Sequence, residues 1–251
     1  MPSSSPSSPV LRIPRSGIRS LMELALADPQ AIHLEVGEPD GRPPQHVVAA
    51  VTEAVARGGA GYSSSVGLPE LRAAAAVRVA RRTGVRVDPE QVVVTHGAMH
   101  GLAMVMATLL GPGDEVLVPD PVFPNWAMAA IASGAVPRTY QARRTEGFVP
   151  LVADVEAAIT DRTRAIVVCS PNNPTGAVYP ADTVAGLVEL ARRHDLWLLS
   201  DECYEQITFG VPHVSPALYD TDGRVVVVHT MSKTFAMTGW RVGFVVAPDH
   251  R

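Results

Sequence analysis

Residues 165–204 read AIVVCSPNNPTGAVYPADTVAGLVELARRHDLWLLSDECY, and this stretch decides the fold class of the 251-residue chain. It contains a largely apolar run at 165–169, a helical pattern at 181–194 and a second apolar run at 196–200. Runs that do not alternate with polar residues are typical of strands buried on both faces of a sheet. A strand, a helix and a strand of these lengths predict two parallel strands joined by a helix.

The same alternation continues on both sides of this stretch. Further strand-like runs lie at 92–95, 115–118, 135–140, 225–229 and 242–246, and further helical patterns at 21–27, 69–82, 98–110, 126–133 and 154–159. The sequence therefore predicts an α/β fold with a mainly parallel seven-stranded sheet and helices on both faces. Because the gap at 231–241 is too short for a helical crossover, we expect the last strand to run antiparallel.

Composition and charge exclude several classes of protein. Lysine and arginine number 21 against 25 aspartates and glutamates, so the net charge is −4, and the basic residues are scattered. This balance argues against an electrostatic nucleic-acid binder. No run approaches the ~20 apolar residues of a membrane helix. The two cysteines, Cys169 and Cys203, form neither a disulfide framework nor a metal-binding spacing, so no metal is expected.

The N-terminal residues, MPSSSPSSP, lack the apolar segment of a secretory signal. Because serine and proline dominate, we expect residues 1–10 to form a disordered tail. Together with the composition, this predicts a soluble cytoplasmic protein.

Polar residues follow the predicted strands, and in open α/β sheets ligands bind beyond the carboxyl ends of strands. After 92–95, Gly97, Ala98 and Met99 open a helix whose free N–H groups suit a phosphate, although a glycine there also serves simple turn geometry. After 165–169, the loop around Asn173 is stiffened by two prolines and offers side-chain amides; it is otherwise a rigid turn, and Pro174 is a candidate for a cis bond.

The two strands that follow end in chemically richer residues. Asp201 and Tyr204 could bind a ring nitrogen and a ring hydroxyl, although an N-cap aspartate beside a partly buried tyrosine is the plainer interpretation. Lys233 lies in a hydroxyl-rich turn, where a desolvated or cationic setting would make it a nucleophile or Schiff-base partner rather than a surface lysine. Hydroxyl groups around it and Arg241 would suit a phosphate monoester. Together these strand ends predict a pocket for a phosphorylated aromatic aldehyde.

Six segments, in this order, resemble the class I/II aminotransferases, which are pyridoxal-phosphate enzymes of fold type I. They are GEPD (37–40), GYSSSVGLPELR (61–72), PGDEVLVPDPVFPNW (112–126), SPNNPTG (170–176), DECY (201–204) and SKTFAMTGWRVG (232–243). The resemblance runs from about Leu11 to the end of the chain.

The resemblance implies a role for each matching residue. Lys233 would form a Schiff base with pyridoxal 5′-phosphate and carry a proton to and from the substrate. Asp201 would bind the pyridinium nitrogen, and Tyr204 and Asn173 would hydrogen-bond the ring oxygen. Phe123 would stack on the ring, and Gly37 and Asn173 would line the substrate side. Tyr62 would bind the cofactor phosphate of the neighbouring subunit in a homodimer. The phosphate of the chain's own cofactor would be held by Gly97, Ala98, Met99, Thr230, Ser232 and Arg241.

The resemblance also implies how the chain is divided. Residues 11–60 would form an N-terminal arm and part of a small domain, and residues 61–251 the large cofactor-binding domain. The C-terminal small domain, with the arginine that binds the substrate's α-carboxylate, has no counterpart in the sequence. We therefore expect a fragment or a truncated gene product, with poor solubility because apolar surface is left uncovered.

The resemblance implies an aminotransferase that moves an amino group between an amino acid and a 2-oxo acid. Two alternatives share the same cofactor motifs and stay open at this point. One is a pyridoxal-phosphate-dependent lyase or decarboxylase acting on an amino acid, and the other is a non-catalytic module that binds the cofactor.

Overall fold

The computed structural model describes residues 8–59 and 61–248. Its seven strands are β1 (Val92–Thr95), β2 (Glu115–Asp120), β3 (Val136–Gln141), β4 (Thr163–Cys169), β5 (Trp197–Asp201), β6 (Val225–Thr230) and β7 (Gly243–Val246). The helices are α1 (Ser8–Leu11), α2 (Gly17–Leu26), α3 (Gln45–Ala56), α4 (Pro69–Thr83), α5 (Gly97–Leu109), α6 (Asn125–Ala132), α7 (Val152–Ala157) and α8 (Ala181–Arg193). Among these residues, no helix is both long and apolar enough to cross a membrane.

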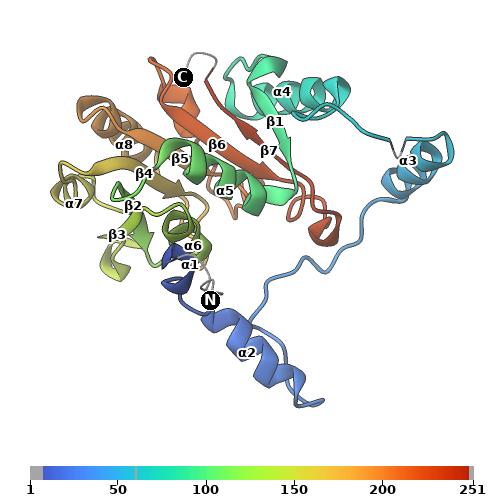
Figure 1. Ribbon diagram of the computed structural model, residues 1–251, viewed down its shortest axis with the longest axis horizontal. Helices are drawn as coiled ribbons and strands as arrows, with labels where there is room; N and C mark the ends of the chain where they lie inside the picture. The colour runs from blue at the N-terminus through green and yellow to red at the C-terminus, as the bar shows by residue number, and fades with distance from the viewer. Residues whose placement is uncertain (1–7, 60, 249–251) are drawn as a thin grey trace, which may run out of the picture.

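The strands form one sheet in the order β1-β7-β6-β5-β4-β2-β3 (Figure 1). Neighbouring strands from β6 through β3 are parallel, whereas β7 runs antiparallel to both β1 and β6. Both the mainly parallel sheet and the antiparallel last strand are thus confirmed.

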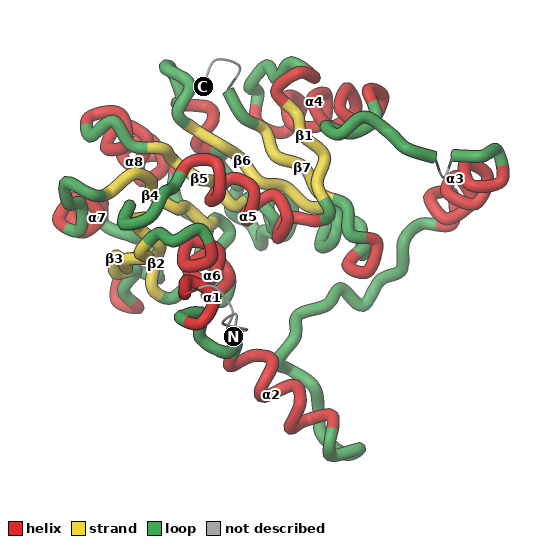
Figure 2. Tube along the Cα trace, in the orientation of Figure 1, coloured by secondary structure: helices red, strands yellow, loops and turns green. Residues whose placement is uncertain are grey.

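Two apolar cores lie on opposite faces of the sheet, because successive side chains of a strand point to opposite faces. Ile166 and Leu198 belong to the core that includes side chains of α4, α7 and α8. Val167 and Leu199, their neighbours along the same strands, belong to the core formed with α5 and α6. The helices therefore cover both faces of the sheet, as the tube in Figure 2 lets the reader follow.

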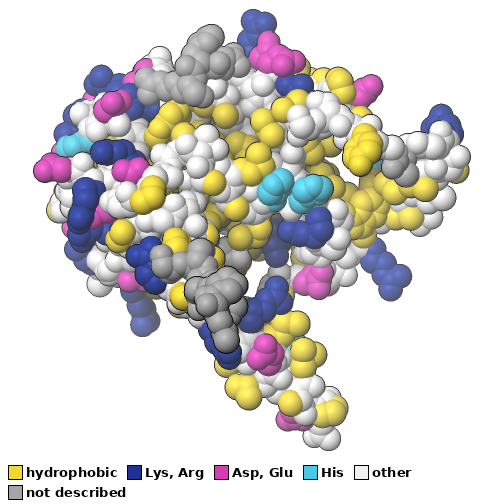
Figure 3. All heavy atoms as spheres, in the orientation of Figure 1, with side chains coloured by type: hydrophobic (Ala, Val, Ile, Leu, Met, Phe, Trp, Pro, Cys, Tyr) yellow, Lys and Arg dark blue, Asp and Glu magenta, His cyan; other side chains and the backbone are white. Residues whose placement is uncertain are grey.

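The N-terminal segment extends away from the sheet (Figures 1 and 2). Neither α2 nor α3 contains a buried residue, and Figure 3 shows hydrophobic side chains along α2. The sequence predicted α2 as 21–27, which is shorter than observed, and did not predict α3. Where it predicted a disordered tail at 1–10, the structure has α1 from Ser8 onward; residues 1–7 lie outside the described residues.

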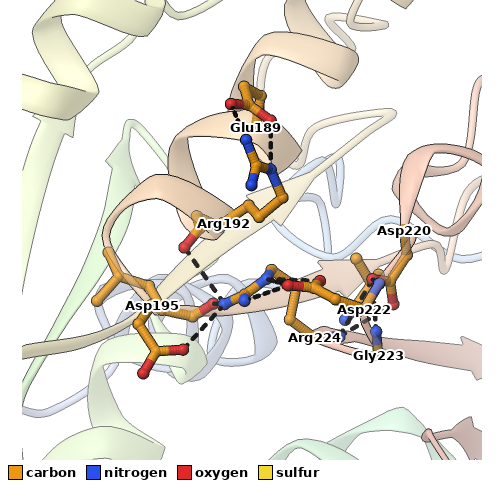
Figure 4. A network of polar contacts seen from close by, with 10 residues as sticks. Glu189, Arg192, Asp195, Asp220, Asp222, Gly223 and Arg224 are labelled. Carbon is orange, nitrogen blue, oxygen red and sulfur yellow. Dashed lines mark hydrogen bonds and ion pairs between the residues drawn. The ribbon is translucent and has the colours of Figure 1, made fainter.

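A buried arginine fixes the start of β6 (Figure 4). Arg224 forms an ion pair with Asp222 and donates from Nη1 to the carbonyl of Leu196 at 2.9 Å. The carboxylate of Asp220 accepts hydrogen bonds from the backbone N–H groups of Gly223 and Val225, at 3.0 and 2.9 Å. These contacts set where β6 enters the sheet, and hence where its other end, with Thr230, lies.

Candidate functional site

The predicted chemical residues gather where three neighbouring parallel strands end. β4, β5 and β6 are adjacent in the sheet and point the same way, so their carboxyl ends share one edge. Asn173 follows β4, Asp201 ends β5, and Lys233 follows β6.

Asp201 is held on both carboxylate oxygens. Its Oδ2 accepts a hydrogen bond from Trp126 Nε1 at 2.9 Å, and its Oδ1 accepts one from the backbone N–H of Cys203 at 3.1 Å. Trp126 is fully buried and Asp201 is 8% exposed. A buried carboxylate with two fixed donors keeps one orientation, which is what binding a ring nitrogen in one position requires.

Tyr204 lies three residues after Asp201 in the chain, and Tyr204 and Asn173 line the same cavity. Burial, and then the nearby Cys203 and Asp201, raise the pKa of the Tyr204 phenol well above its ordinary value of 10. The phenol is therefore a neutral hydrogen-bond donor at physiological pH. The bond between Asn173 and Pro174 is cis, as the sequence predicted.

Lys233 contacts a segment that is almost 200 residues away in the sequence. Its Nζ donates a hydrogen bond to the carbonyl of Gly37 at 2.7 Å, and it lies 5.9 Å from the centre of the Tyr204 ring. A second contact joins the same two segments, since the Thr238 hydroxyl donates to the carboxylate of Glu38. The structure therefore brings Gly37, Lys233 and Tyr204 together.

Two buried hydroxyls lie beside the lysine. Thr230 Oγ1 donates to Ser232 Oγ at 2.9 Å and accepts from the backbone N–H of Ser232 at 3.1 Å. Each residue is 8% exposed. The pair forms a compact polar turn between the end of β6 and Lys233.

The N-terminus of α5 packs very closely against Arg241 and the start of β7. Gly97 has a φ of 75°, and a Cβ placed on it would lie 2.4 Å from Arg241 Nη2. A Cβ on Gly243 would lie 2.8 Å from the carbonyl carbon of Gly97 and 2.9 Å from the amide nitrogen of Ala98. Only glycine at both positions allows β7, Arg241 and the α5 N-terminus to come this close.

Other predicted residues lie further from the lysine or have no described contact with it. Met99 is in the first turn of α5, where its sulfur accepts from Asn125 Nδ2 at 3.1 Å. Phe123 is half-buried in the loop between β2 and α6. Tyr62 is fully exposed, between α3 and α4.

The structure also adds residues that the sequence analysis missed. Trp126 bonds to Asp201, and its position at the end of the FPNW segment, which follows a strand, was an available signal. A cavity of about 400 Å³ shares Asn173 and Tyr204 with the site and is otherwise lined by Pro171, Asn172, Pro174, Gly176, Val178, Ile207, Thr208, Phe209 and Val211. It does not include Lys233 or Asp201.

The donor set fits pyridoxal phosphate. A buried oriented carboxylate suits the ring nitrogen, the phenol and amide suit the ring oxygen, and a primary amine suits the aldehyde. The close approach at Gly97 brings the first amides of α5 together with the Arg241 guanidinium, and Thr230 pairs with the neighbouring Gly243. Amides, a guanidinium and a hydroxyl-bearing turn suit a phosphate.

Comparison with known proteins gives one consistent result. The sequence profile of the family described as aminotransferase class I and II matches residues 29–251. The chain is 41% identical over 232 residues to the aspartate/prephenate aminotransferase of Thermus thermophilus, and 43% identical over 216 residues to the arginine–pyruvate transaminase of Pseudomonas aeruginosa. These alignments cover 90% and 86% of this chain but 59% and 55% of the relatives.

A solved structure agrees with this result. The aspartate aminotransferase of Thermus thermophilus, solved with maleate, superposes with a TM-score of 0.93 at 38% identity. The superposition covers 97% of this chain and 65% of that one. The chain thus spans about three fifths of the length of the relatives it matches.

Proposed function

Because the chain belongs to the class I and II aminotransferase family, we propose that it moves an amino group between an amino acid and a 2-oxo acid with pyridoxal 5′-phosphate bound at Lys233. The observation that carries the proposal is the arrangement at one sheet edge of a lysine amine, a buried carboxylate and a phenol–amide pair. A family fold alone hosts many activities, so these side chains matter more than the fold.

We assign the cofactor contacts as follows. Asp201 binds the ring nitrogen, and Tyr204 with Asn173 binds the ring oxygen. Phe123 stacks on the ring. The phosphate is held by Gly97, Ala98, Met99, Thr230, Ser232 and Arg241.

When bound, the cofactor supplies an electron sink for negative charge at the substrate's α-carbon. The chain's own part is positioning and proton transfer. Trp126 and the Cys203 amide hold the Asp201 carboxylate in one orientation, so its charge stays directed at the ring. Lys233 Nζ, released from Gly37, takes a proton from one face of the substrate and returns it.

We further propose a homodimer in which Tyr62 binds the cofactor phosphate of the neighbouring subunit, while Gly37 and Asn173 line the substrate side. The full exposure of Tyr62 supports this, because nothing within the described part of the chain covers its ring. The relatives' substrates differ, since their names include aspartate/prephenate and arginine–pyruvate activities. The proposed substrate class is accordingly amino acids and 2-oxo acids in general.

The test is the absorbance spectrum of the purified chain with pyridoxal phosphate, beside Lys233→Ala, before and after a panel of amino acids. We expect a lysine-dependent band that one or more amino acids convert to the pyridoxamine form with release of the 2-oxo acid. Release of CO₂ or ammonia without an acceptor would instead favour a decarboxylase or lyase. A band that no amino acid changes would indicate a cofactor-binding module, and the absence of any lysine-dependent band would overturn the proposal.

A further inference from the structure

A buried polar cluster lies behind the cofactor residues, against α4. It consists of Arg78, Glu202, Glu205, His213 and His229, which we call the brace. Three members of the brace are next to a proposed cofactor residue in the sequence. Glu202 follows Asp201, Glu205 follows Tyr204, and His229 precedes Thr230. The brace is therefore coupled through the backbone to three of the cofactor contacts.

Glu205 is the centre of the brace. His229 Nδ1 lies 2.7 Å from Glu205 Oε2, and Arg78 forms an ion pair with Glu205 Oε1. The Arg78 guanidinium also lies 5.0 Å from the centre of the Phe235 ring, two residues after Lys233. Through these contacts Glu205 joins α4, the end of β6 and the lysine loop.

The rest of the brace surrounds Glu202, which is 1% exposed. Its Oε1 accepts a hydrogen bond from Ser215 Oγ at 2.6 Å, and its Oε2 lies 3.1 Å from His213 Nε2. A cavity of about 10 Å³, room for a single water, lies among Glu202, Glu205, His213 and His229. His229 Nε2 is buried there without a hydrogen-bond partner among the described residues.

This cluster is an ion-pair network rather than a metal site. Ligand atoms of Glu202, Glu205 and His229 lie within 4.8 Å of one another, a spacing that a cation could use. However, Arg78 already pairs with Glu205, and Arg82 lines the same cavity. Glu205 thus already pairs with Arg78 and His229, and Glu202 lies beside His213, so both carboxylates have basic partners within the chain.

We propose that Glu205, held between Arg78 and His229, is a positioning residue that fixes Tyr204 and the Lys233 loop for cofactor binding. The inference rests on the proposed function. Tyr204 lies outside regular secondary structure, in a run of turns after β5, so its backbone is not held by the sheet ladder. A side chain in such a turn keeps a fixed place only when packing and neighbouring hydrogen bonds hold it, and Glu205 supplies those bonds at the next residue.

Four variants test the proposal in the full chain. Glu205→Gln removes the negative charge of the carboxylate. His229→Phe removes the hydrogen-bond donor to Glu205 but keeps a ring that can stack on Phe244, whose ring centre is 4.8 Å away. His229→Asn restores a donor near the position of His229 Nδ1. Glu189→Gln, which removes an exposed charge paired with Arg192, is the control. For each, the measurements are the dissociation constant of pyridoxal phosphate, the pH midpoint of the Lys233-dependent absorbance band, and the melting temperature without cofactor.

We expect Glu205→Gln and His229→Phe to weaken cofactor binding about tenfold, the effect of one lost charge-assisted hydrogen bond, and to shift the pH midpoint of the band. His229→Asn and Glu189→Gln should match the parent chain in cofactor dissociation constant and in the pH midpoint of the band. If Glu205→Gln does not fold, the Phe and Asn variants of His229 decide the matter alone.

Two outcomes would overturn the inference while leaving the proposed function intact. In one, the parent chain binds cofactor and both disruptive variants keep its dissociation constant and band midpoint. In the other, His229→Asn, which restores the donor to Glu205, is as impaired as His229→Phe, which means that the hydrogen bond does not determine cofactor binding. A parent chain without a lysine-dependent band would defeat the proposed function, and this inference with it.

Discussion

Gly97 has two separate reasons to be glycine, and they can be measured apart. Its φ of 75° is a conformation that L side chains rarely adopt, and a Cβ there would lie 2.4 Å from Arg241 Nη2. Gly147 has a φ of 61° and nothing within 4 Å of the same position, so it has only the first reason.

We predict that Gly97→Ala lowers the free energy of unfolding more than Gly147→Ala does. The conformational penalty is about 1 kcal/mol at either site, and Gly97→Ala should also weaken pyridoxal-phosphate binding because Arg241 is displaced. Urea unfolding and a cofactor titration check this. Equal losses for the two variants, with unchanged cofactor affinity, would mean that Arg241 does not hold the phosphate.

Trp126 gives the second prediction at the level of single residues. Trp126→Phe removes the hydrogen bond to Asp201 and should cost about 1–2 kcal/mol of stability together with weaker cofactor binding, because Asp201 is no longer oriented. The matched control is Tyr140→Phe, which removes a buried hydrogen bond of 2.7 Å to the Val167 carbonyl away from the site. It should lose similar stability and keep its cofactor affinity; the idea fails if Trp126→Phe behaves the same way.

The residues proposed to carry the chemistry could be read from the sequence because they lie in short contiguous motifs after strands. Asp201, Tyr204 and Lys233 are of this kind. Trp126 and Glu205 were not predicted, since their importance comes from partners 75 and 24 residues away. The FPNW segment drew attention to Trp126, but no local pattern states that its side chain will meet Asp201. The Gly37–Lys233 contact was expected only as a shared site, and the hydrogen bond itself emerges from the fold.

At the level of elements, Arg224 explains how one strand takes its place. Its side chain is 5% exposed and bonds Asp222 and the carbonyl of Leu196, so β6 is tied to the segment that precedes β5. The nearby Arg192–Glu189 ion pair is solvent-exposed, since both of its side chains are 50% exposed. Figure 4 draws both arginines with their acidic partners.

We predict that Arg224→Met lowers the free energy of unfolding by about 2 kcal/mol, because the buried carbonyl of Leu196 and the partly exposed Asp222 lose a charged donor. Arg192→Met should change it by less than about 1 kcal/mol, as is usual for an exposed pair. Urea denaturation of the two variants gives the comparison directly. Similar losses would show that burial does not distinguish these two ion pairs.

Strands could be predicted from the sequence better than the N-terminal helices. β4, β5 and β6 are nearly pure apolar runs, so their bounds differ from the predicted ones by one or two residues at most. The helix α3 has Val48, Val51 and Val55 at helical spacing on one side, a readable pattern, but β-branched residues weaken helix propensity. The three valines are exposed, and no core among the described residues reveals which way α3 should face.

For the whole molecule, the brace predicts an acid-sensitive fold. Burial favours the protonated form of Glu205, but the hydrogen bond and charge of His229 and the charge of Arg78 outweigh it, lowering the pKa of Glu205 from 4.5 to about 2. The unfolded chain then takes up the proton first. The contribution of Glu205 to stability is therefore complete above pH 4.5 and is lost as the pH falls toward 2.

The difference in unfolding free energy between the parent chain and Glu205→Gln should accordingly shrink as the pH falls. Urea titrations at several values between about pH 6 and about pH 3 measure it. A difference that stays constant over this range would contradict a lowered pKa for Glu205.

The exposed N-terminal helices give a prediction about association. Val51 and Val55 are 45% and 58% exposed on α3, and apolar surface of this kind favours contact with another chain. We expect the 251-residue chain to self-associate in sedimentation velocity, and Val51→Lys with Val55→Lys to reduce this. Leu218→Lys, at a single exposed leucine elsewhere, is the control and should have no effect. A parent chain that sediments as a monomer would refute the expectation.

The place of β7 in the sheet also bears on how the chain is made. β7 lies between β1 and β6, and β1 pairs with no other strand in the described residues. During synthesis β1 therefore leaves the ribosome on the order of 150 residues before its partner exists. Until the ribosome has passed Val246, one edge of β6 is unpaired and β1 has no partner strand, so both are open to wrong pairing until β7 is made.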